Sequence, residues 1–314
     1  MLLERSSSYS SGSRMMFKYV FLIVAVLLII FLLHKTDKVS YGDMQMFQRP
    51  RQPSKFFDTW NDCARKKFSS DDLSPDEFWK GFSRLSAECD TEISAVKSMN
   101  IVELRNLDES KYVIYPVLDN GENIFVTLGI GLDISAEKAF KTAMTSRNQN
   151  VTFFGADPIV EGNSKIWSEI GTYFPYAVSG SAGFFEASVY LDGTYRSMPV
   201  ATVDIYYFLD KVLKKKVYDY LWMDAEYAEF EVFDMFYRDG PLDNLGISFC
   251  QMSLEVHQVG AGDKRQDKYQ TFIKRLIDER RYGFFLSAYV GHNRLWLFNY
   301  DSEYCVRKFL PHLI

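Results

Sequence analysis

The amino-acid sequence predicts an α/β fold whose sheet is mostly parallel, with an antiparallel edge strand. Short apolar runs alternate with helical patterns between residues 111 and 281, and repeated strand–helix alternation is typical of a parallel sheet covered by helices. The chain then reads as two strands, 283–290 and 294–300, joined by a turn at 291–293. A closing hairpin of this kind adds an antiparallel strand to the edge of the sheet.

The remaining elements follow from the spacing of apolar residues. Short runs rich in β-branched and aromatic side chains indicate strands, and apolar residues at i, i+3 and i+4 indicate helices. The predicted strands cover 112–115, 124–128, 151–155, 176–178, 218–223 and 247–256. The predicted helices cover 135–144, where Ser135 is available as the N-cap, and 163–170, 202–213, 226–237 and 267–281.

The composition supports one large folded domain with appendages. Of the 314 residues, 47% are hydrophobic and 16% are aromatic, which is enough to bury a core and excludes a wholly disordered chain. The net charge of −5 argues against a nucleic-acid-binding surface. Only four histidines are present, and the four cysteines include no pair at metal-ligand spacing, so the sequence predicts no metal site.

The N-terminal region predicts a membrane anchor. Residues 19–33 contain no charged side chain, and with the apolar residues before Lys18 the segment approaches the ~20 residues that span a bilayer. No small-residue cleavage site follows it, so a retained anchor is favoured over a cleaved signal peptide. We therefore expect a cytosolic Ser-rich tail at 1–18, a transmembrane helix at 19–33 in contact with the lipid bilayer, and a stem at 34–56.

The rest of the chain is expected in the lumen of the Golgi or endoplasmic reticulum, as in a single-pass type II membrane protein. Most of the chain follows the span, and basic residues are slightly more frequent before it than after it. Asn150 begins an N-glycosylation sequon. An oxidising lumen would allow disulfides Cys63–Cys89 and Cys250–Cys305, with four buried thiols as the alternative.

Two parts are predicted after the stem, a helical extension at 57–110 and a larger domain at 111–314. In the extension, Ser74 and Glu77 form a capping box ahead of an amphipathic helix. A shorter helix is indicated upstream, so a Cys63–Cys89 bridge would join two helices.

The turn after the strand at 124–128 is the first candidate for a binding site. Gly129 and Gly131 stand between that strand and the next helix, where glycine lets the backbone approach a ligand and the helix N-terminus offers free N–H groups. The next strand is followed by Asp157, at a distance along the chain where an acid can accept hydrogen bonds from ribose hydroxyls. Each feature alone is also compatible with an ordinary tight turn, but together they favour a nucleoside cofactor.

Acidic residues and a histidine follow the next two strands. Asp224, Glu226 and Glu229 come directly after the strand at 218–223, although acids at a helix start also complement the helix dipole. Glu255 and His257 end the strand at 247–256, and alternation points both side chains to the same side. Ligands of doubly wound sheets bind beyond the carboxyl ends of the strands, so these groups are expected near one cleft.

These segments resemble the FkbM-type methyltransferases, in particular an animal, nematode-expanded branch with a membrane anchor. The resemblance rests on the order and spacing of motifs within 124–140, 154–158, 171–178, 224–229 and 254–257. It implies a Rossmann-like fold, S-adenosylmethionine as methyl donor, and O-methylation of a sugar or another small-molecule hydroxyl.

The resemblance also implies roles for individual residues. Gly129 and Gly131 would belong to the cofactor loop, Asp157 would bind ribose, and Asp224 and Glu226 would match the family's Asp-x-Glu-Gly stretch. The sequence departs from the family pattern twice. Thr127 and Leu128 stand where an acid usually precedes the first glycine, and Tyr227 stands where the family has glycine.

Methyl transfer to a hydroxyl needs a base near the nucleophile. We expect His257 in this role, oriented by Glu255, with Asp224 as the second candidate. One alternative is an inactive methyltransferase fold that acts as a binding module in the secretory pathway. A Golgi-type glycosyltransferase shares the anchor–stem–domain layout, but no Asp-x-Asp site is present. A purely structural anchor protein would leave the strand-end acids unexplained.

Overall fold

The computed structural model describes residues 54–68, 73–117, 121–191 and 193–314. The chain divides into two compact units, 1–46 and 47–314, and every described residue belongs to the second. The expected tail, transmembrane helix and most of the stem lie outside the described residues. Among the helices that are described, none has the length and hydropathy required to cross a bilayer.

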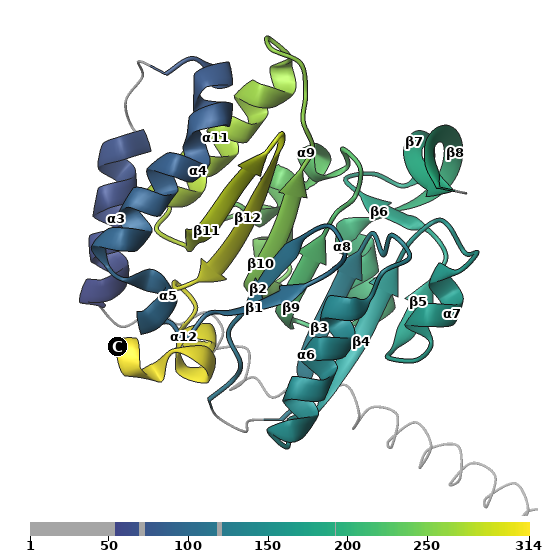
Figure 1. Cartoon of the computed structure of the whole chain (residues 1–314), viewed down its shortest axis with the longest axis horizontal. Helices are drawn as coiled ribbons and strands as arrows, with labels where there is room; N and C mark the ends of the chain where they lie inside the picture. The colour runs from purple at the N-terminus through teal and green to yellow at the C-terminus, as the bar shows by residue number, and fades with distance from the viewer. Residues whose placement is uncertain (1–53, 69–72, 118–120, 192) are drawn as a thin grey trace, which may run out of the picture. The chain divides into compact units, whose positions relative to one another are not determined.

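A seven-stranded sheet forms the centre of this unit, in the order β11-β12-β10-β9-β3-β4-β5 (Figure 1). Its strands are β3 (Asn123–Leu128), β4 (Val151–Ala156), β5 (Thr172–Phe174), β9 (Val217–Met223), β10 (Ser248–Val256), β11 (Tyr282–Val290) and β12 (His292–Asn299). The five central and right-hand strands pair in parallel. The mostly parallel sheet expected from the sequence is therefore present.

The closing hairpin places its antiparallel strand one position in from the edge. Strand β12 pairs antiparallel with both β10 and β11. The outermost strand β11 therefore runs in the same direction as the parallel strands. The chain first forms β11 at the edge of the sheet, and β12 then fills the position between β11 and β10. The sequence predicts the hairpin, but not which of its strands adjoins β10.

Two smaller sheets account for several differences from the predicted elements. Strands β1 (Val102–Arg105) and β2 (Ser110–Val113) form an antiparallel ribbon, and β6 (Ala177–Ser179), β7 (Gly183–Leu191) and β8 (Thr194–Asp204) form a sheet in the order β6-β8-β7. The strands predicted at 112–115 and 176–178 thus lie outside the main sheet, and β5 at its edge was not predicted.

The helix predicted at 202–213 is wrong in its first part, where β8 continues to Asp204. Thr202 and Val203 are β-branched and pair with the short strand β6, which keeps the backbone extended. The Asp204 side chain then accepts hydrogen bonds from the N–H groups of Tyr206 and Tyr207. This cap starts α8 (Ile205–Tyr207), which continues as a π-helical turn, η1 (Phe208–Leu213).

The other helices surround the sheet. They are α3 (Lys55–Phe68), α4 (Pro75–Glu92), α5 (Ala95–Ser98), α6 (Ser135–Ser146), α7 (Asn163–Trp167), α9 (Glu229–Val232), η2 (Phe233–Phe236), α10 (Pro241–Asn244), α11 (Lys264–Asp278), α12 (Glu303–Phe309) and η3 (Pro311–Leu313). The expected Ser135 cap is replaced by Asp133, whose Oδ1 accepts a hydrogen bond from the Ser135 N–H at 2.9 Å.

Helix α6 lies in front of β3 in Figure 1 and is held there by aromatic packing. Phe140 of α6, Phe125 of β3 and Tyr220 of β9 are all fully buried. The Phe140 ring centroid lies 4.9 Å from that of Phe125 and 4.7 Å from that of Tyr220. Truncating a buried phenylalanine to alanine costs about 3–5 kcal/mol, so these contacts hold the middle of α6 against β3 and β9.

The helical extension shares its hydrophobic core with the sheet. The predicted capping box of α4 is formed, with Ser74 and Glu77 bonding each other's backbone N–H groups. Phe82 of α4 packs on Phe284 of β11, with ring centroids 5.6 Å apart. Both expected disulfides are present, Cys63–Cys89 between α3 and α4, and Cys250–Cys305 between β10 and α12.

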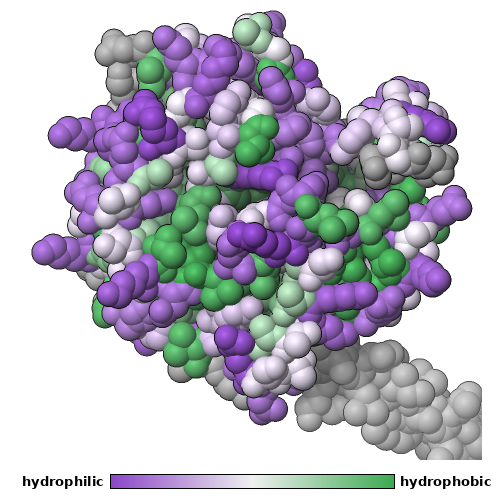
Figure 2. All heavy atoms as spheres, in the orientation of Figure 1, coloured by the Kyte–Doolittle hydropathy of each residue, from purple (hydrophilic) through white to green (hydrophobic). Residues whose placement is uncertain are grey.

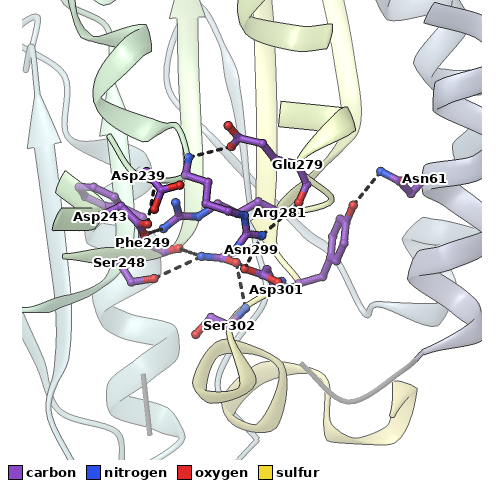
Figure 3. A network of polar contacts seen from close by, with 12 residues as sticks. Asn61, Asp239, Asp243, Ser248, Phe249, Glu279, Arg281, Asn299, Asp301 and Ser302 are labelled. Atoms are coloured by element: carbon purple, nitrogen blue, oxygen red, sulfur yellow. Dashed lines mark hydrogen bonds and ion pairs between the residues drawn. The ribbon is translucent and has the colours of Figure 1, made fainter. Parts of the chain in front are cut away.

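A network of polar contacts joins the start of β10 to the end of β12 (Figure 3). Asn299 is 1% exposed, and its Nδ2 donates hydrogen bonds to Ser248 Oγ and to the Phe249 carbonyl, at 3.2 and 3.0 Å. Its Oδ1 accepts from the N–H groups of Asp301 and Ser302, both at 3.1 Å. This amide therefore uses all its hydrogen-bonding capacity at the end of the sheet opposite the site described below.

Candidate functional site

The carboxyl ends of β3, β4 and β9 open on one pocket. It has a volume of about 420 Å³ and is lined by Gly129, Gly131, Asp157, Asp224 and Glu226, among others. This volume lies within the usual range for small-molecule sites. The predicted cofactor loop therefore faces the same cavity as Asp157, Asp224 and Glu226, whereas Glu255 lines a different cavity.

The ribbon β1–β2 stands beside this pocket. Residues 106–109 and Lys111 line both it and a neighbouring cavity of about 480 Å³ that also contains Glu255 and Arg294. Figure 2 shows a mostly hydrophilic face with patches of hydrophobic side chains near its middle. Leu107, in the turn of the ribbon, is 93% exposed. An apolar side chain so exposed at a pocket mouth is available to a ligand.

Glycine is required at position 129. Its φ is +84°, and a Cβ built there would lie 1.7 Å from the carbonyl oxygen of Asp224. The close approach comes from pairing of the strand ends, because the N–H of Asp224 donates to the Leu128 carbonyl at 2.9 Å. Gly131, with φ +63°, has open space where a Cβ would stand. The absence of a side chain at Gly129 thus lets the ends of β3 and β9 lie close together, while Gly131 leaves room in the pocket.

Asp157 holds the glycine loop in place. Its Oδ2 accepts hydrogen bonds from the N–H of Ile130 at 2.8 Å and of Gly131 at 3.5 Å, and its Oδ1 accepts from the Ile159 N–H at 2.7 Å. The side chain is 7% exposed, and burial raises its pKa above the ordinary aspartate value despite these bonds. The sequence predicts a ribose ligand here; the structure shows a carboxylate engaged with backbone N–H groups at the pocket wall.

His257 is the centre of a second cluster, at the ends of β9 and β10. Its Nδ1 lies 3.0 Å from Glu229 Oε1, and the same oxygen accepts a hydrogen bond from the His257 backbone N–H at 2.7 Å. Its Nε2 lies 3.4 Å from Asp224 Oδ1 and 3.5 Å from Glu226 Oε2. His257 is 5% exposed and Glu229 is fully buried, so the cluster joins the two strand ends beneath the surface.

Two expectations for this cluster need correction. The sequence gives Glu229 no role beyond that of an acid at a helix start, yet it is the group that orients His257. Glu255, expected in that role, is instead paired with Arg294, whose Nε lies 2.8 Å from Glu255 Oε2. Pairing of β10 with β12 places Arg294 opposite Glu255. A cross-strand partner of this kind cannot be read from sequence spacing alone.

The charges in the cluster determine which group can take a proton. Burial alone would lower the pKa of His257, but the hydrogen bond and charge of Glu229, with the charges of Asp224 and Glu226, raise it to about 9. Burial and the negative charge of Glu255 raise the pKa of Asp224 to about 7. The Asp224 side chain is 36% exposed as a whole, but its Oδ1 is covered and accepts no hydrogen bond from the residues that the structure describes. At neutral pH the imidazole therefore carries a proton, and Asp224 is the better proton acceptor.

The segment that carries these acids is strained. Glu226 has φ +46° and Tyr227 has φ +78°, a left-handed region that non-glycine residues adopt at a cost of order 1–3 kcal/mol each. The same conformation stops the helix predicted at 226–237 from starting before Glu229. The Tyr227 ring packs on His257, with centroids 5.2 Å apart. Tyr227, which stands where the family that the sequence resembles has glycine, thus packs against the histidine.

The cluster also has the spacing of a cation site, which the sequence did not predict. Ligand-type atoms of Asp224, Glu226 and His257 lie within 4.8 Å of one another, and so do those of Glu109, Asp224 and Glu255. A protonated His257 reduces the repulsion between these carboxylates as a cation would, because it places a positive charge between them.

The fold and the pocket define a class of protein: an α/β protein with a mostly parallel sheet and a pocket of small-molecule size at the carboxyl ends of its strands. Residues 92–301 match the methyltransferase FkbM domain. The match covers well over half of the chain, so the chain belongs to the FkbM methyltransferase family. No curated protein and no solved structure gives a significant match.

Proposed function

We propose that the protein transfers a methyl group from S-adenosylmethionine to a hydroxyl of a sugar or another small molecule. One observation carries the proposal: the glycine loop at Gly129 and Gly131 and the proton-accepting Asp224 line the same pocket. A donor in contact with the loop and a hydroxyl at Asp224 would then be neighbours. Proximity of this kind is the main requirement for a displacement between two bound reactants.

The residues present fit such a donor. Gly131 leaves open space at the loop, and the loop's backbone is held by Asp157. Further along the wall, Glu137 of α6 is buried and its Oε2 accepts no hydrogen bond within the described residues. When bound, S-adenosylmethionine supplies an electrophilic methyl group on a positively charged sulfur.

The chain's own residues would prepare the acceptor. Asp224, with its pKa raised to about 7, would take the proton of the attacking hydroxyl. His257, held protonated by Glu229, would limit repulsion between Asp224 and Glu226. Glu255 and Arg294, which line the neighbouring cavity, would offer an acceptor and a donor to other hydroxyls of the substrate. A sugar, with several hydroxyl groups, suits such a surface.

The test is binding followed by transfer, both on the full chain in detergent. Calorimetry with S-adenosylhomocysteine measures binding of the reacted donor, and transfer of labelled methyl to glycan extracts measures the reaction. Binding together with transfer supports the proposal. Binding without transfer to any extract favours the inactive binding module, which the replacement of the family's acid by Thr127 also suggests. Absence of both would reject the methyltransferase assignment for this chain.

We also propose a lumenal location for this unit, behind a membrane anchor at 19–33. Two disulfides support an oxidising compartment. Asn150 is exposed directly before β4, at the opposite end of the strand from the pocket, so a glycan there would leave the site open. Glycosidase treatment should shift the mobility of the wild type and not of Asn150→Gln. Protease digestion of intact microsomes that removes residues 54–314 would contradict the proposed orientation.

A further inference from the structure

Glu137 is a buried acid on the pocket wall that the proposed chemistry leaves without a role. It lies in the first turn of α6, is 1% exposed, and lines the pocket together with Gly129 and Gly131. Its Oε1 accepts a hydrogen bond from Thr127 Oγ1 at 3.2 Å. Its Oε2 is covered and accepts no hydrogen bond from the described residues. The carboxylate therefore has unused capacity next to the glycine loop.

Keeping a carboxyl group in this position lowers the stability of the fold. Burial raises the pKa of Glu137 to about 7, although the positive charge of Lys111 and the Thr127 hydroxyl act against the rise. A buried acceptor without a partner costs free energy that a glutamine or an apolar residue would reduce. A helix-dipole role does not need burial, because an exposed acid in the first turn serves as well. The position thus suits a cationic ligand.

Lys111 supplies the opposite charge on the same wall. It is 6% exposed and lines the same pocket. Burial would lower its pKa, but Glu109, Glu137 and Asp224 raise it above the ordinary lysine value, so it is charged at neutral pH. Its partner in an ion pair is Glu109, in the ribbon turn. An anion and a cation therefore share the wall next to the glycine loop.

We propose that Glu137 and Lys111 bind the zwitterionic amino-acid end of the methyl donor, with the ammonium group on Glu137 and the carboxylate on Lys111. The inference rests on the proposed function and names the groups that recognise one end of its donor. The family's acid before the first glycine is replaced here by Thr127, whose hydroxyl holds the Glu137 carboxylate beside the same loop. The negative charge beside the glycine loop thus comes from Glu137 of α6 and not from a residue of β3.

Two ligands that differ only at this end test the proposal by calorimetry on the full chain in detergent. S-adenosylhomocysteine carries the amino-acid end, whereas 5′-methylthioadenosine has the same nucleoside and sulfur without it. Glu137→Gln should weaken binding of S-adenosylhomocysteine by about ten- to a hundredfold, the usual range for a hydrogen bond to a charged group. Binding of 5′-methylthioadenosine should change less than about twofold. Lys111→Met should show the same selectivity.

The controls separate recognition from folding. Glu161→Gln removes an exposed acid near the loop that does not line the pocket, and should leave both affinities unchanged. Glu137→Asp keeps the charge on a shorter side chain and should give an intermediate loss. Thermal denaturation checks that each variant is folded, and if Glu137→Gln is not, Lys111→Met and Glu137→Asp still carry the comparison.

The outcomes are distinct for the two proposals. Equal weakening of both ligands in Glu137→Gln, or no weakening of either, would overturn the role of Glu137 and leave the methyltransferase proposal intact. A wild-type protein that binds neither ligand would overturn both.

Discussion

The two ends of strand β10 are built in opposite ways. At its start, Asn299 makes four hydrogen bonds, and nearby Arg281 is paired with Asp243 at 2.7 Å. Beyond its other end, His257 lies among three carboxylates. There the covered oxygens Asp224 Oδ1 and Glu229 Oε2 accept no hydrogen bond within the described part of the chain.

The difference separates groups that stabilise the fold from groups that are available for chemistry. Removing a polar group that makes all its hydrogen bonds lowers the stability of the fold, because several buried partners are left unsatisfied. A group held with incomplete bonding can gain from a ligand or a proton, and such groups concentrate at functional sites. We therefore expect changes at the two ends of β10 to affect different properties.

The largest effect is expected from Asp224→Asn. If Asp224 takes the proton of the acceptor, its loss should lower methyl transfer by about 10²–10⁴-fold, with affinity for S-adenosylhomocysteine nearly unchanged. The unfolding free energy should not fall, because a neutral amide removes a poorly solvated charge. The matched control is Asp267→Asn, in an exposed position on α11. Equal turnover in the two variants would remove Asp224 from the mechanism.

At the other end of β10, Asn299→Ala should have the reverse effect. The change leaves the Phe249 carbonyl and two N–H groups without their partner, at an expected cost of about 3 kcal/mol. Urea denaturation measures the loss, and methyl transfer by the fraction that remains folded should stay within about twofold of the wild type. A large fall in methyl transfer without loss of stability would contradict the proposal that this end of β10 stabilises the fold and the other end carries the chemistry.

A smaller effect is expected at Tyr227, whose backbone is strained and whose ring packs on His257. Tyr227→Gly places glycine at φ +78° and should raise the unfolding free energy by about 1 kcal/mol, since non-glycine residues are disfavoured there by that order. It also removes the ring that packs on His257, so turnover should fall. Tyr227→Ala is the matched control, because it removes the ring and keeps the strain. If Tyr227→Gly is no more stable than Tyr227→Ala, the strain has been overestimated.

The smallest effect is a pH dependence of stability. Burial raises the pKa of Asp90 to about 6, and the pKa of Glu137 and Asp224 to about 7. Folding therefore takes up protons between about pH 4 and 7, and stability falls as pH rises through that window. The contribution of His257, whose pKa is raised to about 9, is complete below about pH 6.5 and is lost as pH rises through 9.

Thermal denaturation between pH 5 and 9 should show these slopes as a decrease of a few degrees in unfolding temperature. In His257→Gln the slope between about pH 7 and 9 should disappear, while the slope at lower pH remains. A wild-type profile that rises from pH 5 to 9 would contradict the assignment of raised pKa values in this cluster.

The elements that the sequence predicts well are those with a local cause. The strands at 124–128 and 218–223 are apolar runs, and the capping box of α4 depends on residues three positions apart. The errors occur where a distant partner overrides local preference. Thr202 and Val203 pair with β6 and so become part of a strand. Glu229 is buried in contact with His257, which lies 28 positions further along the chain.

The amino-acid sequence by itself determined the alternation of strands and helices, the glycine turn, and the acids and histidine at the strand ends, because hydrophobic periodicity and backbone freedom act over a few residues. The tertiary structure alone decided that β12 lies inside the edge, that Glu229 and not Glu255 holds His257, and that Glu137 shares a wall with Lys111. Those facts depend on register between strands and on the electrostatics of burial, which arise only when segments far apart in the chain are brought together.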